Sequence, residues 1–204
     1  MASKFKAHPW HGITIGENAP ELVTAFIEIV PTDTVKYEID KESGYLKIDR
    51  PQKFSNVVPS LYGFLPQTYC GVKIAEYASL RSGKEVLKGD GDPLDICVLS
   101  EHTITHGDIV LQAIPIGGLR LIDKGEADDK IIAVMKQDEL YNMWKDISDI
   151  PGTIINRLKH YFLTYKNLPG SEKPTCEITD VYGREEAYEV IKRSREDYAD
   201  KFKD

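Results

Sequence analysis

Residues 88–100 read KGDGDPLDICVLS, an aspartate-rich turn that runs directly into an apolar segment. Three carboxylates, those of Asp90, Asp92 and Asp95, fall on this turn. Two carboxylates about 4 Å apart repel each other by about 4 kcal/mol at an effective dielectric constant near 20, so three together are costly unless cations share them. A solvated acidic turn is the ordinary alternative. Because Pro93 restricts the loop and a core strand is expected to follow, the pattern favours a preorganised cation site.

Carboxylate oxygens without imidazole or thiolate neighbours suit hard cations, so this turn favours Mg²⁺ or Mn²⁺ over Zn²⁺. A calcium-binding EF-hand loop is the obvious rival, since Asp90, Asp92 and Glu101 match its positions 1, 3 and 12. The rival fails at position 6, where the loop requires glycine and this chain has Asp95. The following positions are apolar and strand-like, which also excludes an EF-hand.

A second acidic loop, LIDKGEADDKIIAV at 121–134, lies between two expected strands. Alone it is typical of a solvated hairpin, but beside the first turn it predicts a site for several metal ions. Cationic and phenolic residues elsewhere then indicate a phosphate ligand, because carboxylates hold Mg²⁺ and Mg²⁺ holds phosphate oxygens. No GxxxxGK[ST] loop occurs, which disfavours a P-loop nucleotide site. The second loop contributes Asp123, Glu126, Asp128 and Asp129, and the cationic and phenolic residues are Lys36, Arg50, Tyr62, Lys130, Tyr165 and Lys166.

The order of hydrophobic patterns predicts an α+β fold that is mainly β. Residues 34–40 alternate apolar and polar side chains, as in a half-buried strand, and residues 45–50 return as a hairpin partner. Residues 152–166 and 184–202 repeat apolar residues at helical spacing. Many strands followed by two helices predict a sheet or small barrel with flanking helices, not a parallel doubly wound sheet. Further strands are expected at 25–30, 95–99, 108–116, 118–123, 130–135 and 176–183.

Residues 1–204 are interpreted as one domain, since the chain has no internal repeat and no low-complexity linker. The net charge of −7 disfavours nucleic acid and anionic membranes as partners. We find no apolar stretch typical of a signal peptide or a membrane span. The three scattered cysteines fit a reducing compartment better than a disulfide framework, so we expect a cytoplasmic protein.

The motif DGDPLD at 90–95 resembles the signature of the family I soluble inorganic pyrophosphatases. The resemblance covers about residues 20–200, and the other matching segments follow in the family's order. It implies a closed, twisted, five-stranded OB-like barrel with two flanking C-terminal helices. It further implies Mg²⁺-dependent hydrolysis of pyrophosphate to two phosphates, and a homo-oligomer that is usually a hexamer in compact bacterial members. The other matching segments are IEI at 27–29, KYEIDKESG at 36–44, DR at 49–50, YGF at 62–64, Asp123 to Lys130, and HYF…YK at 160–166.

The same resemblance implies roles for individual residues. Asp92 is expected to be the general base that takes a proton from the attacking water, while Asp95 bridges two metal ions. Two cations lower the pKa of such a water toward neutrality. Glu28 is expected to support the site, although alone it reads equally as a core carboxylate with a local partner. The expected metal ligands are Glu38, Asp90, Asp95, Asp123 and Asp128, and the expected substrate-binding residues are Lys36, Arg50, Tyr62, Lys130, Tyr165 and Lys166.

Four features depart from the family's usual pattern. Val58 and Leu61 replace a tyrosine and an asparagine, and Lys124 stands where many members carry an acidic residue. The segment 70–89 is longer than in compact bacterial members. A hairpin lid at the mouth of the site and a surface excursion or subunit contact are equally compatible with it.

Two other functions stay open on the sequence alone. A non-catalytic OB-type binding module would need a basic groove with interleaved aromatic residues, and the acidic loops count against it. A metal-dependent hydrolase of a larger diphosphate, such as a nucleotide, is the second; no nucleobase-stacking feature stands out in the chain.

Overall fold

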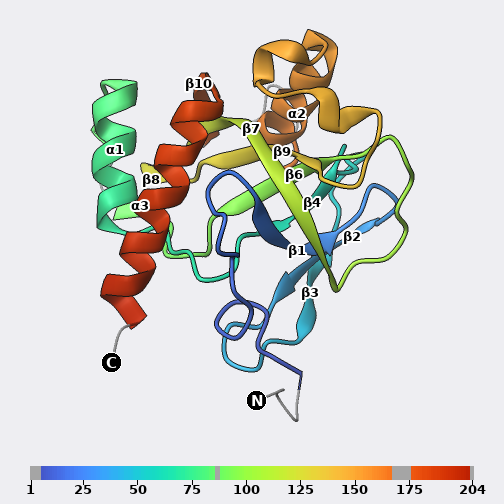
Figure 1. Cartoon of the computed structure of the whole chain (residues 1–204), viewed down its shortest axis with the longest axis horizontal. Coiled ribbons are helices and arrows are strands. Elements are labelled where there is room, and N and C mark those ends of the chain that lie inside the picture. The colour runs from blue at the N-terminus through green and yellow to red at the C-terminus, as the bar shows by residue number, and fades with distance from the viewer. Residues whose placement is uncertain (1–5, 86–87, 167–175, 203–204) are drawn as a thin grey trace.

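The computed structural model describes residues 6–85, 88–166 and 176–202, and within them five strands form a closed ring of hydrogen-bonded neighbours (Figure 1). Four of the five pairings around the ring are antiparallel, and one is parallel. The ring confirms the expected fold, which is mainly β. In ring order the strands are β1 (Val23–Ile29), β4 (Leu61–Phe64), β6 (Asp95–Leu99), β9 (Lys130–Met135) and β7 (Ile109–Asp123), and β7 pairs again with β1.

Strand β7 is continuous where the sequence predicted two strands, 108–116 and 118–123. A Cβ atom on Gly118 would overlap the ring of Tyr182, so glycine permits the close approach of strand β10 (Cys176–Gly183) at this point. The pairing of β7 with β9 also changes register beside Gly117. The glycine pair therefore makes the strand irregular without ending it, and the prediction of two separate strands was wrong.

Shorter strands extend or accompany the ring. Strands β8 (Glu126–Ala127) and β5 (Lys88–Gly89) continue the sheet beyond β7, and β10 pairs along the second half of β7. Strands β2 (Val35–Ile39) and β3 (Leu46–Pro51) form a separate two-stranded sheet, as the alternating pattern predicted. The hairpin and the ring both position charged side chains of the site described below.

In the part of the chain that the structure describes, three helices pack against the strands, one more than the two that were expected. The predicted C-terminal helices are α2 (Gly152–Thr164) and α3 (Arg184–Phe202). The additional helix, α1 (Val72–Ser82), lies beside α3 in Figure 1. Helix α1 occupies most of the segment 70–89, so the prediction of a hairpin in this segment was wrong. Residues 86–87 of the segment lie outside the described residues. Two short 3₁₀ turns, η1 (Tyr141–Met143) and η2 (Ile147–Asp149), precede α2.

From Ile96 to Leu99, strand β6 of the ring is buried on both faces. In β6, Ile96 and Val98 belong to a cluster that includes residues of α1 and α3, whereas Cys97 and Leu99 belong to a cluster that includes residues of α2. Successive side chains of a strand point to opposite faces, so both faces must be apolar here. This explains the uninterrupted apolar run after Asp95.

Within the described residues, no helix has the length and apolar character needed to cross a membrane. The three cysteines, Cys70, Cys97 and Cys176, are all buried free thiols.

Candidate active site

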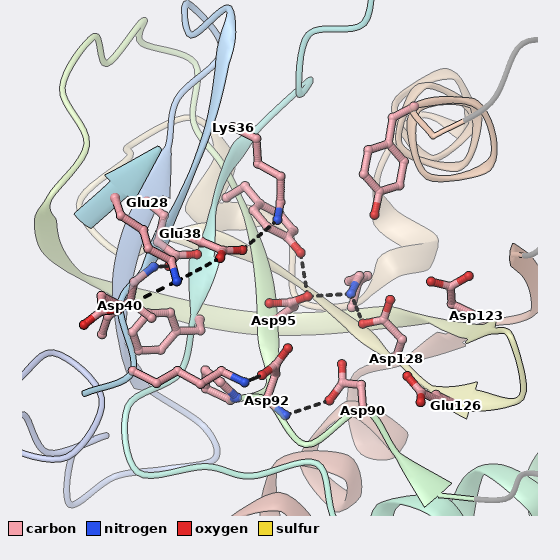
Figure 2. Close-up of a pocket in the computed structure, with 18 of the residues that line it drawn as sticks. Glu28, Lys36, Glu38, Asp40, Asp90, Asp92, Asp95, Asp123, Glu126 and Asp128 are labelled. Carbon is pink, nitrogen blue, oxygen red and sulfur yellow. Dashed lines mark hydrogen bonds and ion pairs between the residues drawn. The ribbon is translucent and has the colours of Figure 1, made fainter. Parts of the chain in front are cut away.

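A cavity of about 670 Å³ lies beside the β2–β3 hairpin and is lined mainly by charged side chains (Figure 2). Of the described residues that line it, ten are acidic and five are basic, an excess of five acidic side chains. We call it the carboxylate cavity. Twelve of the thirteen predicted site residues line it, and Arg50 lines an adjoining cavity. The twelve are Glu28, Lys36, Glu38, Tyr62, Asp90, Asp92, Asp95, Asp123, Asp128, Lys130, Tyr165 and Lys166.

The aspartate turn is held by its own backbone. Gly91 has a φ of 77°, a left-handed conformation that glycine adopts without strain. The N–H of Asp92 donates to Asp90 Oδ1 at 3.0 Å, and the carbonyl of Asp92 accepts from the N–H of Cys70 at 2.8 Å. Figure 2 shows Asp90, Asp92 and Asp95 around the same space. The turn therefore supplies a preorganised set of carboxylates, as its sequence indicated.

The second acidic loop divides between two sides of the strand that follows it. Asp128 and Lys130 line the carboxylate cavity. Asp129, between them, is buried elsewhere, where it accepts hydrogen bonds from Arg120 at 3.2 Å and from the hydroxyl of Tyr182 at 3.0 Å. Because neighbouring residues of an extended chain point to opposite sides, Asp128 reaches the cavity and Asp129 does not.

Lys130 is a buried residue in the lining of the carboxylate cavity. Its ammonium group contacts Asp95 Oδ2 at 2.5 Å and also forms an ion pair with Asp128. Burial by itself lowers the pKa of Lys130, but the carboxylates of Asp128 and Asp95 outweigh it and raise this pKa well above its ordinary value. The hydroxyl of Tyr62 donates to the same oxygen of Asp95 at 2.5 Å.

Not all the carboxylates are compensated in this way. Burial, followed by the negative charge of Asp128, raises the pKa of Asp90 to about 9. One oxygen of Asp123, Oδ1, is buried and accepts no hydrogen bond, while its Oδ2 contacts Lys166 Nζ at 2.6 Å. The cavity thus holds more carboxylate than its lysines neutralise.

Glu28 is a buried member of the site, with 7% of its surface exposed. It accepts a hydrogen bond from the N–H of Ile39 at 2.6 Å, which ties β1 to the β2–β3 hairpin. Burial and then the negative charge of Asp95 raise its pKa to about 8. The local backbone partner and the position in the cavity agree with both interpretations of this residue.

Sequence reasoning missed several residues that contact predicted ones, among them Asp49 and Lys41. Asp49 Oδ2 accepts from Lys36 Nζ at 2.8 Å, and Lys36 Nζ also contacts Glu38 Oε2 at 3.2 Å. Lys41, in the turn of the hairpin, forms an ion pair with Asp92. Lys41 lies in the matched segment KYEIDKESG, and Asp49 lies in the matched segment DR. Their position in these segments was the only sequence signal that could have identified them.

The departures from the family pattern fall into two groups. Val58 and Leu61 are buried core residues, with 0% and 3% of their surfaces exposed. Apolar packing therefore occupies positions at which the resemblance implies polar groups. Lys124 is exposed in the turn between β7 and β8, outside the carboxylate cavity. Helix α1 contributes no residue to this cavity or to the adjoining one, so it forms no lid over them.

The donor chemistry fits a hard divalent cation. Nearly every candidate ligand is a carboxylate oxygen, and the unpartnered oxygen of Asp123 is an acceptor that a cation satisfies. In the described parts of the chain, no three acidic, histidine or cysteine side chains converge closely enough to hold a metal ion as they stand. The ammonium groups of Lys130 and Lys166 are the cations that these carboxylates contact instead.

Comparisons with known proteins agree on one family. A family model described as inorganic pyrophosphatase matches residues 25–199. An inorganic pyrophosphatase of Chlamydia muridarum is 54% identical over 199 residues, covering 96% of this chain and 95% of the relative. Soluble inorganic pyrophosphatase 1 of Arabidopsis thaliana is 35% identical, covering 95% of this chain and 81% of the relative. The crystal structure of an inorganic pyrophosphatase from Thermus thermophilus matches with a TM-score of 0.78 and 28% identity, covering 95% of this chain and 99% of that one.

Proposed function

The chain belongs to the inorganic pyrophosphatase family, and we propose that it hydrolyses pyrophosphate to two orthophosphates in the carboxylate cavity with the help of Mg²⁺. The observation that carries this proposal is the pairing of uncompensated carboxylates with a rim of lysine, arginine and tyrosine side chains around one cavity. Metal ions explain why acidic and basic side chains surround the same cavity. Metal ions bound to the carboxylates neutralise their charge and allow the pyrophosphate anion to bind there. Family membership also favours an enzyme over the non-catalytic binding module.

The proposed cation ligands belong to the group of carboxylates that Figure 2 shows around the cavity. Bound Mg²⁺ supplies positive charge that neutralises the phosphates and makes a neighbouring water more acidic. We prefer Mg²⁺ for the all-oxygen donor set, and Mn²⁺ or another hard divalent ion is compatible with the same ligands. The ligands are Asp90, Asp95, Asp123 and Asp128, with Glu38 for an ion that arrives with the substrate and Glu28 in support.

Asp92 accepts the proton of the attacking water in this proposal. Its carboxylate lines the cavity, with 47% of the Asp92 side chain exposed, and forms an ion pair with Lys41. An accessible carboxylate beside the metal ligands is suited to proton transfer. The oxygen–phosphorus bond to water forms as the bridging phosphorus–oxygen bond breaks, and the second phosphate leaves.

The departing phosphate carries the charge that must be stabilised. Lys36 and Arg50 reach it from the β2–β3 hairpin, and Tyr165 and Lys166 from the end of α2. Arg50 lies over the ring of Tyr165, at 5.7 Å from its centre, and both residues line the adjoining cavity. Tyr62 from β4 and Lys130 from β9 complete the proposed set of substrate-binding residues.

The decisive experiment measures phosphate release from pyrophosphate with Mg²⁺ and with a chelator. Asp92→Asn is expected to lower kcat by about 10² to 10⁴, the range that general-base catalysis contributes. Asp108→Asn is the matched control, because Asp108 has the same exposed side-chain fraction as Asp92, 47%, and lines neither cavity. Metal-independent release, or equal activity of the two variants, would contradict the proposal.

We also propose a cytoplasmic homo-oligomer, with a hexamer as the expected form, that acts on pyrophosphate and binds neither nucleic acid nor membranes. The buried free thiols of the three cysteines support a reducing compartment. Light scattering on the purified chain tests the oligomer. Activity on pyrophosphate compared with a nucleoside diphosphate tests the alternative of a larger diphosphate substrate.

A further inference from the structure

The segment 69–71, which leads into helix α1, is joined to the aspartate turn by backbone hydrogen bonds. The N–H of Cys70 donates to the carbonyl of Asp92 at 2.8 Å, and the carbonyl of Cys70 accepts from the N–H of Gly91 at 3.1 Å. A Cβ atom on Gly89 would lie 2.1 Å from the carbonyl oxygen of Cys70, so glycine permits this close approach. Cys70 is therefore bonded to the turn at two consecutive residues, one of which is the proposed general base.

Helix α3 binds the same segment through one buried carboxylate. Asp197 Oδ2 accepts from the N–H of Gly71 at 3.0 Å and from the N–H of Ile74 at 3.1 Å, and its Oδ1 accepts from the N–H of Lys73 at 3.0 Å. Only 6% of the surface of Asp197 is exposed. Gly71 directly follows Cys70 in the chain, so Asp197 holds the residue next to the one that holds the turn.

The N–H groups that Asp197 accepts from lie at the start of α1, which has no cap of its own. In the described part of the chain, the N-cap position is Gly71, which makes no side-chain capping bond, and the first turn has no acidic residue. The first N–H groups of a helix find no partner within the helix. A carboxylate beside them satisfies them and interacts favourably with the helix dipole. Asp197 therefore caps α1 from a different helix.

The other polar links between α1 and α3, which lie side by side in Figure 1, are more exposed. Lys73 forms an ion pair with Asp200, and 64% of the Asp200 side chain is exposed. Arg81 pairs with Glu186 at 2.5 Å, and 47% of the Arg81 side chain is exposed. Exposed ion pairs contribute little to stability, whereas buried hydrogen bonds to a charged acceptor are stronger. We therefore expect the attachment of segment 69–71 to depend mainly on Asp197.

A displacement of the backbone at Asp92 affects two carboxylates at once. Asp92 carries the proposed general base, and its N–H donates to Asp90 Oδ1 at 3.0 Å. Both side chains line the carboxylate cavity. A displacement of about 1 Å in a catalytic group can lower the rate about 10²-fold. Loosening the contacts of Cys70 is therefore expected to impair both proton transfer and metal binding.

We propose that Asp197 is a positioning residue for the reaction in the carboxylate cavity. By capping α1 it holds Cys70 against the aspartate turn and so places the carboxylates of Asp90 and Asp92. This inference rests on the proposed function of that cavity. Asp197 lines neither the carboxylate cavity nor the adjoining one, so it acts through the backbone. The segment 70–89 then supports the aspartate turn and does not cover the site.

The kinetic test compares variants of Asp197 in the full-length enzyme at saturating Mg²⁺. Asp197→Ala is expected to lower kcat for pyrophosphate about tenfold and to change KM less than about twofold. KM is expected to hold because the proposed substrate-binding residues come from the β2–β3 hairpin, the end of α2 and the ring strands, not from α1 or α3. Asp197→Asn keeps one of the two acceptor oxygens and is expected to lie between Asp197→Ala and the wild type.

Val190→Ala is the control that separates positioning from a general loss of stability. Val190 is a buried residue of the same helix, with 1% of its surface exposed, and the substitution removes apolar contacts but no hydrogen bond. It is expected to lower Tm and to leave kcat as it is in the wild type. All variants are assayed below the temperature at which circular dichroism shows the first of them to unfold.

Calorimetric titration of Mg²⁺ into the metal-free chain gives a readout that does not depend on activity. Asp197→Ala is expected to bind Mg²⁺ about tenfold more weakly than the wild type, because the support of its ligands is removed. Wild-type kcat and Mg²⁺ affinity in Asp197→Ala would overturn the proposal, as would an equal loss in Val190→Ala. A wild type that releases no phosphate rejects the proposed function instead, and the Mg²⁺ titration then still decides whether Asp197 positions the turn.

Discussion

Two clusters of buried charge lie on opposite sides of the short segment 128–130. On one side, Asp128 and Lys130 belong to the carboxylate cavity. On the other side, Asp129 meets Arg120, a fully buried arginine that also contacts Glu186 at 2.7 Å. The same three residues of sequence thus contribute to two sites with different physical properties.

The cluster around Arg120 is charge-compensated, because Arg81 also pairs with Glu186, at 2.5 Å, and gives two cations for two carboxylates. Arg120 faces two carboxylates, lies over the rings of Tyr77 and Tyr182 at 5.2 Å and 4.9 Å, and joins the sheet to α1 and α3. The Arg120 side chain is completely inaccessible to solvent. The carboxylate cavity is accessible and keeps an excess of negative charge. Compensated, dry charge stabilises an arrangement of elements, whereas uncompensated, accessible charge is available to a ligand.

The largest expected effect breaks the dry cluster. Arg120→Ala leaves Asp129 buried without its cation and is expected to lower the free energy of unfolding by about 3 to 5 kcal/mol. Urea denaturation with and without Mg²⁺ measures the free energy of unfolding. Mg²⁺ is not expected to reduce the difference in this free energy between Arg120→Ala and the wild type. Arg184→Ala, which removes an exposed partner of Glu185, is the control, with an expected loss below about 1 kcal/mol. Similar losses for the two variants would contradict the role given to Arg120.

A smaller effect is expected when the cation of the carboxylate cavity is removed. Lys130→Met leaves Asp95 and Asp128 facing each other, which is expected to cost about 1 to 3 kcal/mol of stability in metal-free buffer. Mg²⁺ is expected to narrow the difference from the wild type, because it binds the native carboxylates and not the unfolded chain. Thermal unfolding over a Mg²⁺ series measures it. If Mg²⁺ does not change the difference in stability between Lys130→Met and the wild type, the carboxylate cavity behaves like the Arg120 cluster, and the proposed difference between the two clusters is wrong.

The pH dependence of metal-free stability sharpens the comparison further. The native pKa of Glu28, about 8, lies above its ordinary value of 4.5, so the native state binds the proton more tightly than the unfolded state. The corresponding stabilisation is complete below pH 4.5 and is lost as the pH rises to 8, by up to about 1.4 kcal/mol per pH unit. Glu28→Gln is expected to make this decline shallower without abolishing it, because Asp90, whose pKa is raised to about 9, still contributes. Urea titrations from pH 5 to pH 8 compare the two slopes, and parallel slopes would show that Glu28 does not titrate in this range.

The smallest effect is expected at the rim of the carboxylate cavity. Lys41→Ala removes the ion pair with Asp92, but 55% of the Lys41 side chain and 47% of the Asp92 side chain are exposed. The change in the free energy of unfolding is therefore expected to stay below about 1 kcal/mol and to shrink with added salt. Denaturation at low and high salt checks this. A loss as large as that of Lys130→Met would mean that the rim is as tightly coupled as the interior.

Sequence alone was enough for the features that depend on local pattern. The alternation of residues 34–40 predicted a hairpin strand, and the helical spacing of 184–202 predicted α3 with the bounds that the structure has. The motif DGDPLD indicated a crowded carboxylate turn, and its flanking matches indicated the family. These features are local because side-chain period, turn chemistry and motif spacing are properties of neighbouring residues.

Only the tertiary structure decided the features that depend on distant partners. The role of Asp129 is set by Arg120 and Tyr182, from β7 and β10, and adjacency to Asp128 in the sequence had suggested one acidic loop. Helix α1 forms because Ile74, Ala75 and Ala78 are buried, a short apolar stripe that is weak before its contacts are known. The carboxylate cavity and the adjoining cavity arise only when the hairpin, the end of α2 and the β7–β8 turn come together. Charge compensation and burial depend on all the groups that lie near a residue in the folded protein. The order of residues along the chain does not determine them by itself.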